Sequence, residues 1–137
     1  MMMVVIPILF LLAVPLVSFA QPASGGDQKH LILPGQAAEL IRCDSTIVLL
    51  DVRTPQEFRS ETGHLRGALL IPVQELEKRI DELGPYRKRK IIVYCRTGHR
   101  SAKATEMLLE RGFDALNMEG GITRWRAEEL PTVDGAR

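Results

Sequence analysis

The sequence lacks an excess of either charge, because 18 Lys and Arg residues stand against 17 Asp and Glu residues. Nucleic acid or an anionic membrane would need a surface rich in positive charge, so neither is an expected partner. One basic run, Arg87-Lys88-Arg89-Lys90, is short and holds no aromatic residue, which favours a solvated loop. Any preference for an anionic ligand must therefore be local.

Cysteine is also scarce. Only Cys43 and Cys95 are present, and no CxxC spacing occurs, which excludes a thioredoxin-like exchange motif. A single disulfide between them in an oxidising compartment is an alternative that stays open. The three histidines, His30, His64 and His99, lack the spacing of metal ligands, so we expect neither a metal site nor a cofactor.

Charged side chains are absent from residues 1–20, an apolar run that ends in Ser18-Phe19-Ala20. This pattern predicts a signal peptide cleaved after Ala20, followed by a polar segment over residues 21–34. We therefore expect an exported protein, with the periplasm as its compartment. The run has no Lys or Arg behind Met1, and an uncleaved membrane anchor is the alternative.

The remaining chain predicts one α/β domain over residues 35–132 and a short tail over 133–137. With 137 residues, 45% of them hydrophobic, the chain is long enough for one domain with a core. After a turn at Pro34-Gly35, segments with helical spacing alternate with short apolar runs typical of buried strands. The expected helices cover 36–43, 54–58, 73–83, 101–110 and a segment after Gly121, and the expected strands cover 46–50, 69–72, 91–94 and 113–118. This alternation favours a parallel sheet with helices on both faces.

Two polar residues follow predicted strands. Asp51 comes after residues 46–50, and Cys95 comes after residues 91–94. Ligands of open parallel sheets bind at the carboxyl ends of the strands, so we expect both side chains on one face of the domain.

The loop behind Cys95 reads Arg96-Thr97-Gly98-His99-Arg100-Ser101. A loop between a strand and a helix can direct backbone N–H groups inward, where the helix dipole adds positive charge. Such surroundings stabilise a thiolate and lower the pKa of the thiol. The guanidinium groups suit oxyanions, and the Ser101 hydroxyl can donate to sulfur. We therefore predict Cys95 as the nucleophile and Arg96, Thr97, Gly98, His99, Arg100 and Ser101 as substrate-binding residues. A buried structural cysteine is the competing interpretation, but it would favour an apolar continuation.

The length of this loop separates two chemistries. In phosphatases of the Cys-x5-Arg type an arginine stands six residues after the cysteine, where this chain has Ser101. Arg100 comes one residue earlier, so the loop suits a reacting centre smaller than a phosphoryl group, such as a sulfane sulfur. A Cys-dependent phosphatase or arsenate reductase is the less favoured alternative.

These residues resemble the rhodanese-like family from about Gly35 to Thr132. Four segments carry the resemblance in order: Asp51-Val52-Arg53-Thr54-Pro55-Gln56-Glu57-Phe58; Gly63-His64-Leu65-Arg66-Gly67-Ala68 with Ile71-Pro72; Tyr94-Cys95-Arg96-Thr97-Gly98-His99-Arg100-Ser101; and Gly120-Gly121-Ile122 with Trp125 and Leu130-Pro131. The resemblance implies a sulfurtransferase in which Cys95 takes sulfur from a donor such as thiosulfate and passes it, as a persulfide, to cyanide or a thiol. It also implies that Arg96 and Arg100 hold the donor and that Asp51 supports the site. A strand-end ion pair or a helix cap is the alternative role of Asp51.

Two departures from the family pattern leave the donor open. Some thiosulfate-specialised members carry lysine at the third loop position and arginine just before the aromatic residue of the first signature, where this chain has Thr97 and Glu57. A non-catalytic rhodanese-like module that binds an unknown protein partner through the loop is a further alternative. We expect a monomer in either case.

Overall fold

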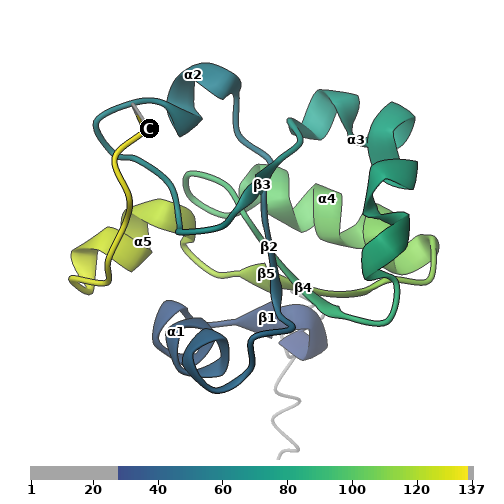
Figure 1. The fold of residues 1–137 in the computed structure, drawn as a ribbon, viewed down its shortest axis with the longest axis horizontal. Helices are drawn as coiled ribbons and strands as arrows, with labels where there is room; N and C mark the ends of the chain where they lie inside the picture. The colour runs from purple at the N-terminus through teal and green to yellow at the C-terminus, as the bar shows by residue number, and fades with distance from the viewer. Residues whose placement is uncertain (1–27, 136–137) are drawn as a thin grey trace, which may run out of the picture.

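The computed structural model describes residues 28–135 (Figure 1). The signal peptide predicted for residues 1–20 lies outside the described residues. Within the described range, none of the helices combines the length and the apolar character that a membrane crossing requires.

The described part of the chain forms one five-stranded sheet with helices around it. The strands are β1 (Leu31–Ile32), β2 (Val48–Asp51), β3 (Leu69–Leu70), β4 (Lys90–Tyr94) and β5 (Asp114–Met118). The α-helices are α1 (Pro34–Cys43), α2 (Pro55–Phe58), α3 (Val73–Arg79), α4 (His99–Glu110) and α5 (Gly121–Ala127), and η1 (Gln28–His30) and η2 (Ile80–Tyr86) are 3-10 helices.

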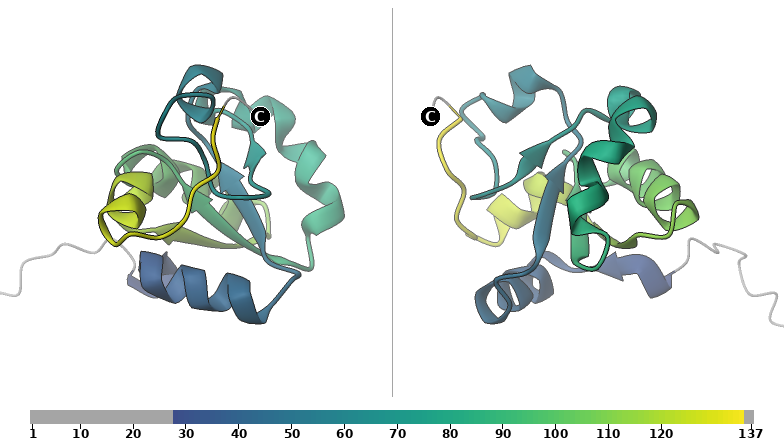
Figure 2. Two further views of the ribbon diagram at one scale, coloured as in Figure 1. Left: turned by 60° about the vertical axis from the view of Figure 1, so that its left-hand side comes forward. Right: turned by 45° about the vertical axis from the view of Figure 1, so that its right-hand side comes forward.

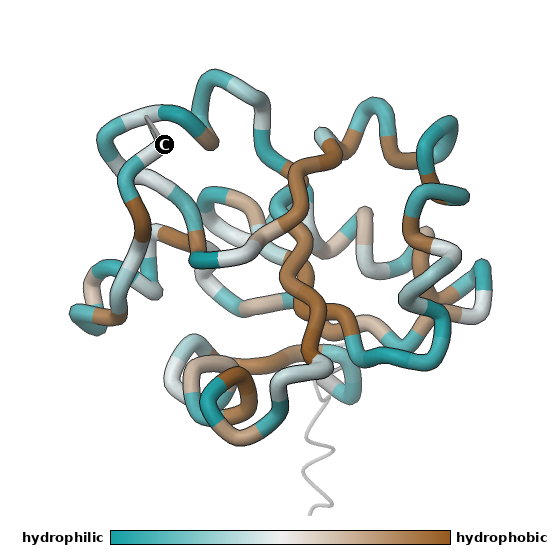
Figure 3. Tube along the Cα trace, in the orientation of Figure 1, coloured by the Kyte–Doolittle hydropathy of each residue, from teal (hydrophilic) through white to brown (hydrophobic). Residues whose placement is uncertain are grey.

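All strand pairs are parallel, in the order β1-β5-β4-β2-β3. Side chains on one sheet face, such as Leu50 and Val93, pack with those of α3, η2 and α4. Side chains on the other face, such as Leu49 and Ile92, pack with α1 and α5 (Figures 1 and 2). Because both faces are covered, the two central strands each hold an unbroken apolar run, residues 48–50 in β2 and residues 91–93 in β4 (Figure 3). The structure thus confirms the predicted parallel α/β sheet with helices on both faces.

Two local predictions were wrong, and one short strand was missed. Pro34-Gly35 is not a turn but the start of α1. The N–H groups in the first turn of a helix have no partner within the helix, so proline, which has no N–H, fits the first position. The helix expected over residues 73–83 is an α-helix only as far as Arg79 and continues as a 3-10 helix to Tyr86. Pro85 disfavours the α conformation of the residue before it, Gly84. No strand was expected at Leu31–Ile32, and this two-residue strand pairs with β5.

Candidate active site around Cys95

The sheet register places Asp51 and Cys95 at the same edge. Asp51 ends β2 and lies opposite Tyr94, the last residue of β4 and the neighbour of Cys95. The Val52 N–H donates to the Tyr94 carbonyl at 3.1 Å, which extends the strand pairing to the point where the Cys95 loop begins. Both polar residues therefore lie at the carboxyl ends of adjacent parallel strands.

The Cys95 side chain is 1% exposed and lies inside a ring of hydrogen-bond donors. Its sulfur accepts from the Gly98 N–H at 3.0 Å and, as a thiolate, from the Ser101 hydroxyl at 3.3 Å. Gly98 has φ 107°, a left-handed conformation that turns its N–H toward the sulfur. Burial raises the pKa of the thiol, but the Ser101 hydroxyl and the N–H groups of Ser101, Gly98 and Thr97 outweigh it and lower this pKa below its ordinary value.

The other cysteine has the opposite electrostatic setting. Cys43 ends α1, is exposed, and is free, as is Cys95. Its thiol lies 3.6 Å from a carboxylate oxygen of Glu39, and this hydrogen bond to an acid raises the pKa of Cys43. Of the two thiols, only Cys95 has surroundings that favour the thiolate, and the structure holds no disulfide between them.

The start of α5 fixes the curl of the Cys95 loop. The Ile122 N–H donates to the Cys95 carbonyl at 2.9 Å, and the Thr123 N–H donates to the Arg96 carbonyl at 3.1 Å. Gly121 lies against both carbonyls, because a Cβ added there would stand 2.5 Å from each of the two oxygens. Glycine at position 121 is therefore a packing requirement of the loop.

Asn117 on β5 is part of the site, and the sequence analysis missed it. Its Oδ1 accepts from the Ser101 hydroxyl at 2.7 Å, and its Nδ2 donates to the Gly98 carbonyl at 3.3 Å. The side chain is buried, and buried polar groups need hydrogen-bond partners. An amide inside an otherwise apolar strand beside β4 was the signal that could have identified it.

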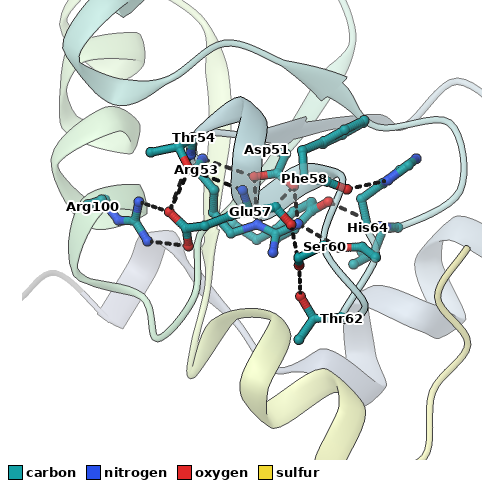
Figure 4. A network of polar contacts seen from close by, with 12 residues as sticks. Asp51, Arg53, Thr54, Glu57, Phe58, Ser60, Thr62, His64 and Arg100 are labelled. Carbon is teal, nitrogen blue, oxygen red and sulfur yellow. Dashed lines mark hydrogen bonds and ion pairs between the residues drawn. The ribbon is translucent and has the colours of Figure 1, made fainter. Parts of the chain in front are cut away.

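Arg100 is bound to Glu57 (Figure 4). Its two terminal nitrogens donate to the two carboxylate oxygens of Glu57 at 2.7 and 2.9 Å. Glu57 is also the third residue of α2, whose N-cap Thr54 accepts from the Glu57 N–H at 3.1 Å. The hydrogen bond from Arg100 is the main reason that the pKa of Glu57 falls to about 2. The guanidinium expected to hold a donor is thus already paired with a carboxylate.

Asp51 forms a buried ion pair. Arg53 donates from Nη2 to Asp51 Oδ2 at 2.7 Å and from Nε to Oδ1 at 3.0 Å, and both side chains are at most 1% exposed. The same Nη2 donates to the Gly63 carbonyl at 2.8 Å. The pair therefore ties the end of β2 to the turn at Gly63, the ion-pair alternative considered for Asp51 (Figure 4).

A cleft of about 480 Å³ opens beside the loop, between α2 and α5. Arg96 of the loop, Arg126 of α5 and Glu57 of α2 contribute to its walls. Thr97 and His99, the other predicted binding residues, are exposed and are not among the residues of this wall. In residues 28–135 no cluster of three or more His, Cys, Asp or Glu side chains is arranged to hold a metal ion.

Comparison with known proteins identifies the family and the fold of the chain. The family model of the rhodanese-like domain matches residues 33–128. The chain is 35% identical over 88 residues to a protein of Allochromatium vinosum named sulfurtransferase, covering 64% of this chain and 78% of that one. It is 36% identical over 86 residues to the thiosulfate sulfurtransferase PspE of Escherichia coli, covering 63% and 78%. The crystal structure of a rhodanese-related protein from Thermoplasma volcanium superposes with a TM-score of 0.68 at 34% identity, covering 76% of this chain and 97% of that one.

The four sequence segments, the parallel α/β sheet and the matching family model all agree, and the chain belongs to the rhodanese-like domain family.

Proposed function

We propose that the protein is a sulfurtransferase that carries a sulfane sulfur as a Cys95 persulfide. The observation that carries this proposal is the buried Cys95 sulfur with its hydrogen bonds from Gly98 and Ser101 and its lowered pKa. A thiolate so stabilised is a nucleophile near neutral pH. The relatives named as sulfurtransferases support the same reaction class.

Transfer from thiosulfate would proceed in two displacements. The Cys95 thiolate attacks the outer sulfur, a new S–S bond forms, and the bond to the sulfonate group breaks so that its electron pair leaves with sulfite. An acceptor such as cyanide then attacks the outer persulfide sulfur, and Cys95 leaves as a thiolate while thiocyanate is released. The donors around the sulfur stabilise the thiolate as nucleophile in the first step and as leaving group in the second.

The charges near the loop restrict which donors it accepts well. Arg96 and Arg126 bring positive charge to the cleft, whereas Glu57 neutralises Arg100. The site therefore offers less positive charge to a doubly negative donor than the three arginines alone would. We propose that thiosulfate is a usable donor but not the best one, and that a donor with less negative charge is preferred.

The test is the mass of the intact protein after incubation with thiosulfate and, separately, with an alkyl persulfide, which carries at most one negative charge on its sulfur. We expect a gain of one sulfur atom that cyanide removes as thiocyanate. Cys43→Ser is the matched control and should load as the parent does, whereas Cys95→Ser should not load. No gain with either donor, or a gain that follows Cys43, would contradict the proposal.

The near-complete burial of Cys95 favours a second candidate, a binding module that engages a protein partner through the rim of the loop. That module would capture its partner equally well after Cys95→Ser and would show no sulfur transfer. A phosphatase is not proposed, because the arginine nearest to the required position is held by Glu57.

A further inference from the structure

The Ser101 hydroxyl lies between two groups that both accept hydrogen bonds. Cys95 Sγ is 3.3 Å from Ser101 Oγ on one side, and Asn117 Oδ1 is 2.7 Å away on the other. All three side chains are buried. A hydroxyl has one hydrogen, so it cannot donate to both neighbours at the same time.

The orientation of the Asn117 amide follows from its second partner. The Gly98 carbonyl can only accept, and it already accepts from the Ala102 N–H at 3.0 Å. The NH₂ group of Asn117 must therefore face this carbonyl, at 3.3 Å, and its Oδ1 must face Ser101. Because Oδ1 is an acceptor 2.7 Å from the hydroxyl, this arrangement assigns the Ser101 hydrogen to Asn117.

This assignment suits a neutral Cys95 better than a thiolate. A neutral thiol can donate its own S–H to Ser101 Oγ, which completes a chain of hydrogen bonds from Cys95 through Ser101 and Asn117 to Gly98. A thiolate instead requires the Ser101 hydrogen. The buried Asn117 Oδ1 then has no hydrogen-bond donor, or the amide group flips and its NH₂ no longer donates to the Gly98 carbonyl.

We propose that Asn117 is a positioning residue that competes with Cys95 for the single hydrogen of Ser101 and so limits formation of the thiolate. Its meaning for catalysis rests on the proposed sulfur transfer, but the competition itself concerns only the thiol and can be measured without any donor. A persulfide has no charge on Sγ and leaves the hydrogen to Asn117. The network therefore favours the resting thiol and the loaded persulfide over the buried Cys95 thiolate.

Other charged side chains lie around the Cys95 loop, and a test must leave them unchanged. They are Arg96 in the loop, Arg100 on α4, Glu57 on α2, and the Asp51 and Arg53 pair at the end of β2. Substitutions at Asn117 and Ser101 alter none of them.

The decisive experiment is a double-mutant cycle at Asn117 and Ser101 that measures the pH dependence of Cys95 alkylation. All variants carry Cys43→Ser, so that Cys95 is the thiol that reacts. Asn117→Leu removes the competing acceptor at similar size and should raise the thiolate fraction about tenfold at a pH below the thiol pKa. In a Ser101→Ala background the same substitution should have no effect on that fraction, because the shared hydrogen is gone. Thr105→Val is the matched control: it removes a 2.7 Å hydrogen bond to the Ser101 carbonyl without touching the sulfur, and should leave the fraction unchanged.

A lower thiolate fraction in Asn117→Leu, or an equal rise with and without Ser101, would overturn the proposal. If Asn117→Leu does not fold, the parent protein still supplies an answer through NMR. The side-chain NH₂ signals of Asn117 should titrate with the same midpoint as Cys95 alkylation, and signals that do not change with pH across that midpoint would refute the competition. Failure of sulfur loading alone would refute the proposed function and leave these readings untouched.

Discussion

The Glu57 carboxylate and the Arg100 guanidinium meet in a two-point ion pair although 43 residues separate them in the chain. The pair joins the short helix α2 to the first turn of α4. It also cancels a positive charge within a few residues of the Cys95 nucleophile. We therefore expect this ion pair to affect both the choice of sulfur donor and the stability of the fold.

Glu57→Gln is expected to improve the use of thiosulfate. The substitution removes a negative charge and releases Arg100 toward the donor, so KM for thiosulfate should fall about fivefold, as expected for an interaction of about 1 kcal/mol between partly exposed ions. Steady-state thiocyanate formation measures this. Glu82→Gln on η2, which breaks a 2.7 Å ion pair with Arg79 of α3, is the control and should leave KM unchanged. An unchanged or higher KM in Glu57→Gln would be inconsistent with the role given to Arg100.

The stabilising effect of the same pair should depend on pH in the acid range. The folded-state pKa of Glu57 lies at about 2, below its ordinary value of 4.5, so the ionised form is favoured by folding. The contribution is therefore complete above about pH 5 and is lost as the pH falls from 4.5 toward 2. Thermal unfolding of the parent and Glu57→Gln should differ by a constant amount at neutral pH, and the difference should shrink over that window. A difference that grows on acidification would contradict the ion pair.

Gly121→Ala is expected to destabilise the fold and to disturb the thiol. The added Cβ would lie 2.5 Å from the carbonyl oxygens of Cys95 and Arg96, at a residue with φ 58°. We expect a loss of about 3 kcal/mol in the free energy of unfolding, together with slower Cys95 alkylation.

Alanine substitutions at two other glycines distinguish the steric clash of the added Cβ from the backbone strain of a positive φ. Gly67→Ala has the same left-handed backbone but no neighbour within 4 Å, and should cost about 1–2 kcal/mol without affecting the thiol. Gly84→Ala has neither problem and should change stability by less than about 1 kcal/mol. Urea unfolding of all three variants makes the comparison, and equal losses for Gly121 and Gly67 would show that the loop contact is unimportant.

Substitutions in the buried ion pair of Asp51 and Arg53 should have non-additive effects on the free energy of unfolding. Asp51→Leu or Arg53→Met alone leaves an unpaired buried charge and should cost about 3–5 kcal/mol in the free energy of unfolding. The double variant should cost clearly less than the sum, because no charge remains buried. Additive losses in chemical denaturation would mean that the two side chains stabilise the fold independently.

The sequence predicted the central strands well because both faces of the sheet are covered. Residues such as Ile91 and Ile92 pack on opposite faces, so the strand reads as one apolar run. The two-residue strand at Leu31–Ile32 is too short to produce a pattern, and it exists only through its pairing with β5. Tertiary pairing, and not local propensity, decides such an edge strand.

The sequence predicted contacts between residues that are neighbours in the chain and missed contacts between residues that are not. The donors to the Cys95 sulfur come from the next six residues, so a local loop was enough to find them. Asn117 lies 16 residues beyond Ser101 and 19 beyond Gly98, and no periodicity encodes those contacts. The pairing of Arg100 with Glu57 is equally non-local, which is why the sequence assigned that guanidinium to a substrate.

The contact of Gly121 with the Cys95 and Arg96 carbonyls also sets an order of events during synthesis. The ribosome completes β4 and Cys95 well before the N–H groups of Ile122 and Thr123, which curl the loop around the sulfur. A nascent chain that has emerged only as far as β5 would carry a cysteine of ordinary reactivity. We therefore expect the lowered pKa of the Cys95 thiol to be established only after α5 has been translated and has packed against the loop.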